Sequence, residues 1–219
     1  MIEFPITTSV GKTVPKTAFY KHLEVNARMK RIFVNDVERI VWANKFAPTT
    51  LNVSDGKFVH EITVFNVLVK NKDCPSDIFV FIDKNIPRHT VFILTDETEC
   101  SVVINYKEEA QGTTGQPYKV TNTYQSPWMH LSEISLPIEG NTMDALYENM
   151  VRHVAGVHII DKAASLKEDI EVSEKQEQLR KEIAALKKKL ALERQPTKKF
   201  ALHKKLKELE KQLKTDYNG

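Results

Sequence analysis

Two runs of leucine and other apolar residues, separated by Pro196, occupy the last quarter of the sequence. Their steps of three and four residues are the spacing of a coiled-coil seam. Pro196 has no backbone N–H to donate, so we expect one helix to end there and a second to begin, which predicts a helical hairpin. The seam could be filled within the hairpin or shared with a partner protein. The predicted partner-binding seam residues are Leu179, Ile183, Leu186, Leu190, Leu202, Leu206, Leu209 and Leu213.

The length of the chain leaves room for one domain in addition to this hairpin. With 219 residues and 41% apolar content, the part before the hairpin can bury a single core. We therefore predict a globular domain over residues 1–161 and a helical hairpin over residues 162–219. The two cysteines, Cys74 and Cys100, cannot form a disulfide framework or a four-thiolate zinc site, which favours the reducing cytoplasm. No apolar run is long enough to suggest a membrane span.

Charge is distributed unevenly along the chain. The net charge is only +3, but residues 162–219 carry 16 basic and 10 acidic side chains. Such a basic segment is typical of a surface that binds nucleic acid or an acidic protein, and the DNA-binding candidates are Lys198, Lys199, Lys204 and Lys205. The alternative is a solvated helix surface, because Lys and Glu favour helices and pair locally.

The body reads as an α+β domain with a mostly antiparallel sheet. Helical spacing predicts helices over residues 17–46 and 76–85, and a helix capped by Asn141 or Thr142. Alternation and turn residues predict one strand pair around Asp55-Gly56 and another around residues 96–99, followed by strands near residues 118–124 and 134–138.

One corner of the body mixes aromatic, amide and ammonium groups. The predicted helix is followed by a predicted strand at this corner, which contains Trp42, Asn44, Lys45 and Asn52. Such a corner could hold a ligand, or its polar groups could satisfy the local backbone.

A nuclease-like pattern is incomplete. Restriction-type nucleases carry an acid on one strand and an acid-x-lysine tripeptide on the next, which together hold Mg²⁺. Here Asp96 ends one strand, and the next contains Asn105-Tyr106-Lys107, so a neutral amide stands where a second carboxylate is needed. A divergent or degenerate nuclease using Asp96 and Lys107 is thus an alternative function. Otherwise the sequence predicts no metal or cofactor, because its histidines lack acid or cysteine partners at ligand spacing.

Several motifs together resemble those of a bacterial domain-of-unknown-function family. They lie at residues 42–52, 82–89, 128–129, 139–144, 147–152 and 200–206. Members of that family are commonly encoded beside Swi/Snf-type helicases and DNA methyltransferases, in loci that resemble restriction or antiphage defence systems. The resemblance implies no catalytic residues. It implies a non-enzymatic accessory subunit that docks on a helicase or another defence protein, with DNA as a further contact.

Overall fold

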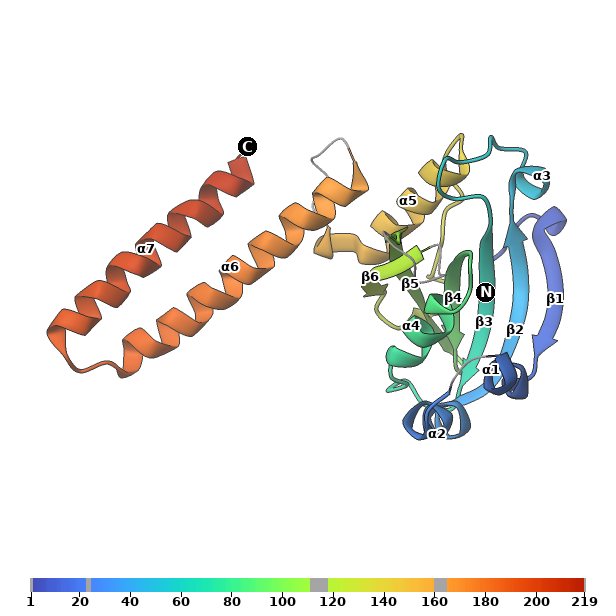
Figure 1. Ribbon diagram of the computed structural model, residues 1–219, viewed down its shortest axis with the longest axis horizontal. Coiled ribbons are helices and arrows are strands. Elements are labelled where there is room, and N and C mark those ends of the chain that lie inside the picture. The colour runs from blue at the N-terminus through green and yellow to red at the C-terminus, as the bar shows by residue number, and fades with distance from the viewer. Residues whose placement is uncertain (1, 23–24, 111–117, 160–164, 219) are drawn as a thin grey trace. The chain divides into compact units, whose positions relative to one another are not determined.

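The computed structural model describes residues 2–22, 25–110, 118–159 and 165–218 (Figure 1). Its internal contacts divide the chain into two units, Met1–Gly156 and Val157–Gly219. The boundary expected between residues 161 and 162 lies outside the described residues. None of the described helices is long and apolar enough to cross a membrane.

The first unit is built on a mixed sheet, which has seven strands within the described residues. Its order is β1-β2-β3-β4-β5-β6, with β7 also pairing with β5. Among the described strands, only β3 and β4 pair in parallel, so the expected mostly antiparallel α+β architecture is confirmed. The strands are β1 (Ser9–Val14), β2 (Val37–Phe46), β3 (Ile62–Val69), β4 (His89–Thr95), β5 (Glu99–Glu109), β6 (Tyr118–Gln125) and β7 (Met129–His130).

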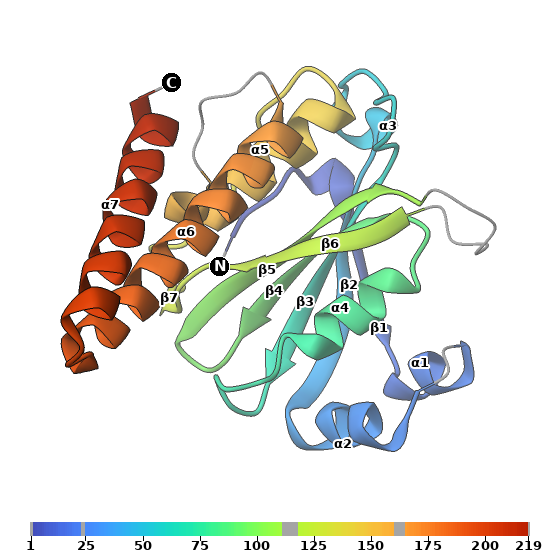
Figure 2. The ribbon, with the colours of Figure 1, turned by 60° about the vertical axis from the view of Figure 1, so that its left-hand side comes forward.

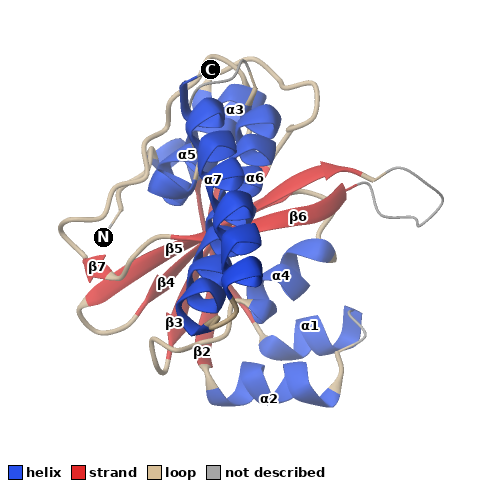
Figure 3. Ribbon diagram, turned by 90° about the vertical axis from the view of Figure 1, so that its left-hand side faces the viewer, coloured by secondary structure: helices blue, strands red, loops and turns tan. Residues whose placement is uncertain are grey.

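Helices α1, α2 and α4 lie on one side of the sheet (Figures 2 and 3). Phe33 of α2, Phe79 of α4 and Phe92 of β4 belong to the core on that side. Helix α4 connects the parallel strands β3 and β4, because parallel neighbours require a crossover. The described helices of this unit are η1 (Ile6–Thr8, a short 3-10 turn), α1 (Lys16–His22), α2 (Ala27–Asn35), α3 (Pro48–Leu51), α4 (Asp77–Lys84) and α5 (Met143–Ala155). A second 3-10 turn, η2 (Gly156–His158), spans the boundary between the two units along the chain.

The helix predicted over residues 17–46 is wrong in its second half. Helix α2 ends at Asn35, and residues 37–46 form β2 in the interior of the sheet. The pairing of β2 with β3 shifts register between Val37 and Arg39. A bulge adds a residue, so the buried Val37 and Ile40 are three positions apart and imitate helical spacing.

The strand pair predicted around Asp55-Gly56 is also wrong. Residues 48–51 form α3, and β3 begins only at Ile62. The Asp144 carboxylate accepts backbone hydrogen bonds from Lys57 (2.6 Å) and Val59 (2.7 Å), which fixes this connection. A Cβ atom at Gly56 would lie 2.4 Å from an Asp144 oxygen, so the glycine allows a close approach.

Other elements of the body agree with the sequence prediction. Helix α4 and the β4–β5 hairpin form as expected, and Asp96 accepts from the backbone N–H groups of Thr98 and Glu99 in the turn. Thr142 caps α5 by accepting from the backbone of Ala145. The strand predicted at residues 134–138 is absent, and that segment has no regular secondary structure.

Strand β1 lies at one edge of the sheet and is interrupted. Its pairing with β2 shifts register between Ser9 and Lys12. Gly11, inside that interruption, has a φ of 66°, which glycine adopts without steric penalty.

The second unit contains two long helices that run side by side as a hairpin (Figure 1). Helix α6 spans Leu166–Leu192, and its N-cap, Ser165, accepts from the backbone of Glu168. Helix α7 spans Pro196–Asn218. Pro196 is thus the first residue of a helix, where its missing N–H costs nothing. The predicted hairpin is confirmed.

Candidate functional site

The corner predicted from Trp42 to Asn52 uses its polar groups internally. The Trp42 indole donates to the Asn44 carbonyl oxygen at 3.0 Å, and the Asn44 amide donates to the Thr8 hydroxyl at 2.8 Å. Asn52 ends α3 in a left-handed conformation with φ of 55°. Trp42 and Asn44 thus form hydrogen bonds within the fold, and Asn52 ends α3.

Lys45 joins a chain of charges at one end of the sheet. Its ammonium lies 2.8 Å from Glu61, and the Arg88 guanidinium lies 3.3 Å from the other oxygen of the same carboxylate. The Lys45 and Arg88 side chains are both partly open to solvent, so screening keeps these ion pairs weak.

The structure does not bring Asp96 and Lys107 together. Asp96 follows β4 and hydrogen-bonds to Glu99 at the start of β5, whereas Lys107 is near the other end of β5. Lys107 is eight positions after Glu99 along β5, which corresponds to roughly 25 Å of strand. The two groups therefore cannot share a metal ion.

Lys107 is instead paired with a buried carboxylate from α4. Its ammonium lies 2.6 Å from Asp83 Oδ1, and both side chains are almost completely buried. Thr90 also donates to Oδ1, and the Asn105 amide donates to Oδ2 at 2.9 Å. The Asn105 amide oxygen in turn accepts from Thr123 at 2.8 Å. The asparagine and lysine of the nuclease-like tripeptide thus face one internal acid.

The remaining protons of the Lys107 ammonium are also satisfied. It donates to the carbonyl oxygens of Asp83 (2.8 Å), Ile86 (3.2 Å) and Arg88 (2.5 Å). Burial lowers the pKa of Lys107 and raises the pKa of Asp83, and the opposite charge of each partner counters both shifts. With these contacts made, Lys107 fastens the end of α4 and the following loop to β5. It is not presented to a substrate.

Two tyrosines enclose His89 on the opposite face of the sheet. The His89 ring centroid lies 4.7 Å from that of Tyr118 and 4.5 Å from that of Tyr147. Burial, reinforced by the charge of Lys107, lowers the pKa of His89 to about 3. The imidazole is therefore neutral at physiological pH. Among the described residues, no cluster of three His, Cys, Asp or Glu side chains could hold a metal ion.

The seam predicted for partner binding is filled within the hairpin. Ile183 and Leu186 of α6 pack with Leu206 and Leu209 of α7 as a buried cluster. The outer seam residues pack against this cluster and are partly buried, namely Leu179, Leu190, Leu202 and Leu213. The seam therefore holds the two helices together.

The connected end of the hairpin, residues 187–207, gathers the positive charge of the second unit. We call this segment the hairpin tip. It contains nine basic side chains and one acidic side chain, Glu193. The four lysines predicted to bind DNA, Lys198, Lys199, Lys204 and Lys205, all belong to it and are exposed. The rest of α6 and α7 carries more acidic than basic residues, so the charge is concentrated where the chain reverses direction.

Large apolar side chains are exposed on the same tip. Leu192 is 82% exposed and Phe200 is 75% exposed. Leu192 lines an open surface hollow of about 480 Å³, whose other lining residues are Lys189, Glu193, Lys198, Ala201 and Leu202. The tip therefore combines an open hollow, lined by apolar and charged residues, with a surplus of positive charge.

Comparison with known proteins bears on the family. A model of a domain of unknown function (DUF4391) matches residues 2–213, which is nearly the whole chain. The chain belongs to DUF4391. Curated proteins and solved structures gave no match. The expected membership of a domain-of-unknown-function family is thus confirmed, and the match covers both units of the DUF4391 chain.

Sequence reasoning missed two features of this DUF4391 chain. The first is the partnership of Asp83 with Lys107, although a carboxylate beside Phe79, Phe81 and Ile82 already signals a buried partner. The second is the concentration of charge at the hairpin tip. Counting charges in short windows along the two helices, rather than over residues 162–219 as a whole, would have found it.

Proposed function

We propose that this DUF4391 chain is a non-enzymatic accessory subunit of a bacterial restriction-like or antiphage defence complex, and that the hairpin tip docks it on a protein partner. The observation that carries the proposal is the tip itself, where exposed Leu192 and Phe200 lie among nine cations. An exposed aromatic residue in a charged rim is typical of a protein interface. The resemblance found in the sequence makes a helicase from the same locus the first partner to test.

The apolar residues favour a protein partner over DNA as the principal contact. Phosphate binding needs only the lysines, and it does not explain a cavity whose lining includes Leu192, Ala201 and Leu202. A partner with an apolar side chain surrounded by carboxylates would complement both the hollow and the positive charge of the tip. DNA binding by the outer lysines would add to this contact.

Two tip variants separate the charge from the apolar contact. The first replaces Lys198, Lys199, Lys204 and Lys205 by Glu, and the second is Leu192→Ser with Phe200→Ser. Because none of these side chains belongs to the buried part of the seam, the hairpin should remain folded. We expect each variant to weaken association with the helicase at least about tenfold, measured by co-purification and by surface plasmon resonance at several salt concentrations.

The matched control reverses four exposed lysines of the first unit, Lys12, Lys30, Lys84 and Lys119, to Glu. It changes the net charge of the chain by the same amount and should leave association intact. Full association of both tip variants would refute the docking proposal. Loss of DNA binding with unchanged helicase binding would show that the tip serves nucleic acid instead. DNA cleavage by the purified complex in the presence of Mg²⁺ or Mn²⁺ would contradict a non-enzymatic role.

A further inference from the structure

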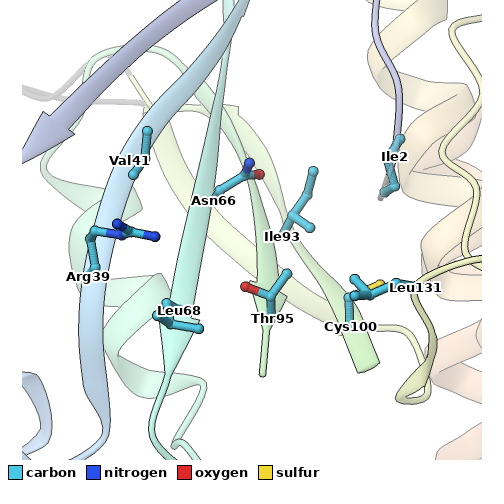
Figure 4. Close-up of a pocket in the computed structure, with 9 residues that line it drawn as sticks. All are labelled: Ile2, Arg39, Val41, Asn66, Leu68, Ile93, Thr95, Cys100 and Leu131. Atoms are coloured by element: carbon cyan, nitrogen blue, oxygen red, sulfur yellow. The ribbon is translucent and has the colours of Figure 1, made fainter. Parts of the chain in front are cut away.

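A second cavity lies in the first unit, on the face of the sheet opposite α4, and has a volume of about 160 Å³ (Figure 4). Most of its lining comes from two neighbouring rows of side chains across adjacent strands. Arg39, Leu68, Thr95 and Cys100 form one row, and Val41, Asn66 and Ile93 form the other. Ile2 and Leu131 complete the lining from outside these strands.

The polar side chains Asn66 and Arg39 line this cavity without a hydrogen-bond or ion-pair partner among the described residues. Asn66 is in β3, a strand with neighbours on both sides, and the residues around it on this face are mainly aliphatic. The Asn66 side chain is half-buried, and asparagine is a poor strand former, so strand propensity does not account for this residue. Within the described part of the chain, no protein group hydrogen-bonds to the side chain of Asn66 or forms an ion pair with Arg39. Both groups remain available to a ligand.

The directions of the side chains define the chemistry of that ligand. The Arg39 guanidinium extends from the edge of the cavity toward Leu68 and Thr95, and the Thr95 hydroxyl is turned back toward Leu68 (Figure 4). Arg39 carries the only formal charge among the lining residues. Burial raises the pKa of the Cys100 thiol, so this residue contributes a neutral wall. The site is thus cationic at one end and apolar beyond it.

From this arrangement we propose that the cavity binds a small organic carboxylate. The carboxylate pairs with the Arg39 guanidinium, whose planar donors match it, and the Thr95 hydroxyl and Asn66 amide provide further donors. The apolar part of the ligand lies against Ile93, Cys100 and the other aliphatic residues. A protein cavity of about 150 Å³ accommodates benzene, so the ligand has about one six-membered ring or a short branched chain beyond its carboxylate. This site is independent of the hairpin tip.

Benzoate and benzamide test the proposal, because they share a ring and differ in charge. In a titration of the full-length chain followed by ¹H–¹⁵N correlation spectra, millimolar benzoate should shift the resonances of the strand segments around Arg39, Asn66 and Thr95. Benzamide should bind at least about tenfold more weakly, since it lacks the charge that Arg39 recognises. Absence of shifts, shifts confined to the basic hairpin tip, or equal affinity for the two compounds would overturn the proposal.

Substitutions identify the residues responsible. Arg39→Gln should weaken benzoate binding at least about tenfold and remove the preference over benzamide, whereas Lys84→Gln, on α4, makes the same charge change and should have no effect. Asn66→Leu should weaken binding and raise the thermal unfolding midpoint, because a poor strand former is replaced by an aliphatic side chain among aliphatic neighbours. A lower midpoint for this variant would show that Asn66 has a structural role, and unchanged benzoate affinity in both site variants would refute the site.

Discussion

Buried charge in the first unit stabilises a connection between elements. Lys107 and Asp83 could have been catalytic groups in an open site. Here oxygen acceptors surround the Lys107 ammonium, and hydrogen-bond donors surround the Asp83 carboxylate. Such a pair contributes little net stability compared with an apolar pair of the same size, yet removal of one member leaves a buried charge without compensation. Its contribution is therefore visible mainly when it is broken.

We expect Lys107→Met to lower the free energy of unfolding by about 3–5 kcal/mol, because it strands the Asp83 carboxylate and three carbonyl groups. Urea denaturation measures the effect. Adding Asp83→Asn should recover part of the loss, since the uncompensated charge is removed. The control is Lys84→Met, which replaces the exposed lysine that follows Asp83 in the sequence. It should change the free energy of unfolding by less than about 0.5 kcal/mol. A Lys107→Met variant as stable as the Lys84→Met control would contradict this role.

His89 makes the stability of the first unit depend on pH. Its pKa is about 3 in the folded chain and 6.5 without these surroundings. Between pH 6.5 and 3 the unfolded chain binds a proton at His89 that the folded chain does not, so the free energy of unfolding falls as the pH falls through this range. Above pH 6.5 His89 is neutral in both states, and its contribution to stability is complete. At pH 5 this one group should lower the free energy of unfolding by about 2 kcal/mol relative to pH 7.5.

The His89→Phe variant tests this contribution because it keeps a ring between Tyr118 and Tyr147 and cannot be protonated. Chemical denaturation of both proteins at several pH values should show a shallower decline for the variant between pH 7.5 and 5. Parallel profiles would mean that His89 is not the group responsible.

The candidate site was only partly predictable at the residue scale. The tripeptide Asn105-Tyr106-Lys107 was recognised as unusual, but its acidic partner was expected to be Asp96. Which acid faces Lys107 depends on the direction of β5 beside β4 and on the position of α4, neither of which is encoded in a local pattern. Asn66 was missed for a related reason, since its isolation is apparent only once the neighbouring strands are placed.

At the scale of elements, the hairpin depends on its own seam. Leu186→Asp with Leu206→Asp places two carboxylates in the buried cluster, which should cost at least about 3–5 kcal/mol and melt α6 and α7. Far-UV circular dichroism should show a large loss of helix. Leu192→Asp with Phe200→Asp is the matched control and should leave the helix content unchanged, because both side chains are exposed. Equal helix loss in the two proteins would contradict an internal seam.

Elements were predictable wherever the local pattern and the tertiary environment agree. The leucine spacing around Pro196 fixed the hairpin, and the cap at Thr142 located α5. The prediction for residues 37–46 was wrong because a bulge places the buried residues of β2 three positions apart. The β-branched Val37, Ile40 and Val41 do favour a strand. The crossover through α4, which makes β3 and β4 parallel, has no signature in residue spacing alone.

For the whole molecule, the two units divide the chemistry between them. The first unit buries the Asp83–Lys107 ion pair and offers a small cavity lined by the Arg39 guanidinium. The second concentrates its cations and two exposed apolar side chains at the hairpin tip. The two proposed sites share no residue, so partner docking and carboxylate binding can be removed separately by mutation.

The interrupted edge strand β1 also affects solubility. An unpaired strand edge is a template on which a second molecule can extend the sheet. Here the irregular pairing between Ser9 and Lys12 and the positive φ of Gly11 interrupt the regular row of backbone donors and acceptors. The charge of Lys12 on this edge also disfavours pairing with a second copy. This edge is therefore protected against strand-by-strand aggregation, and at high concentration the molecules should not polymerise through it.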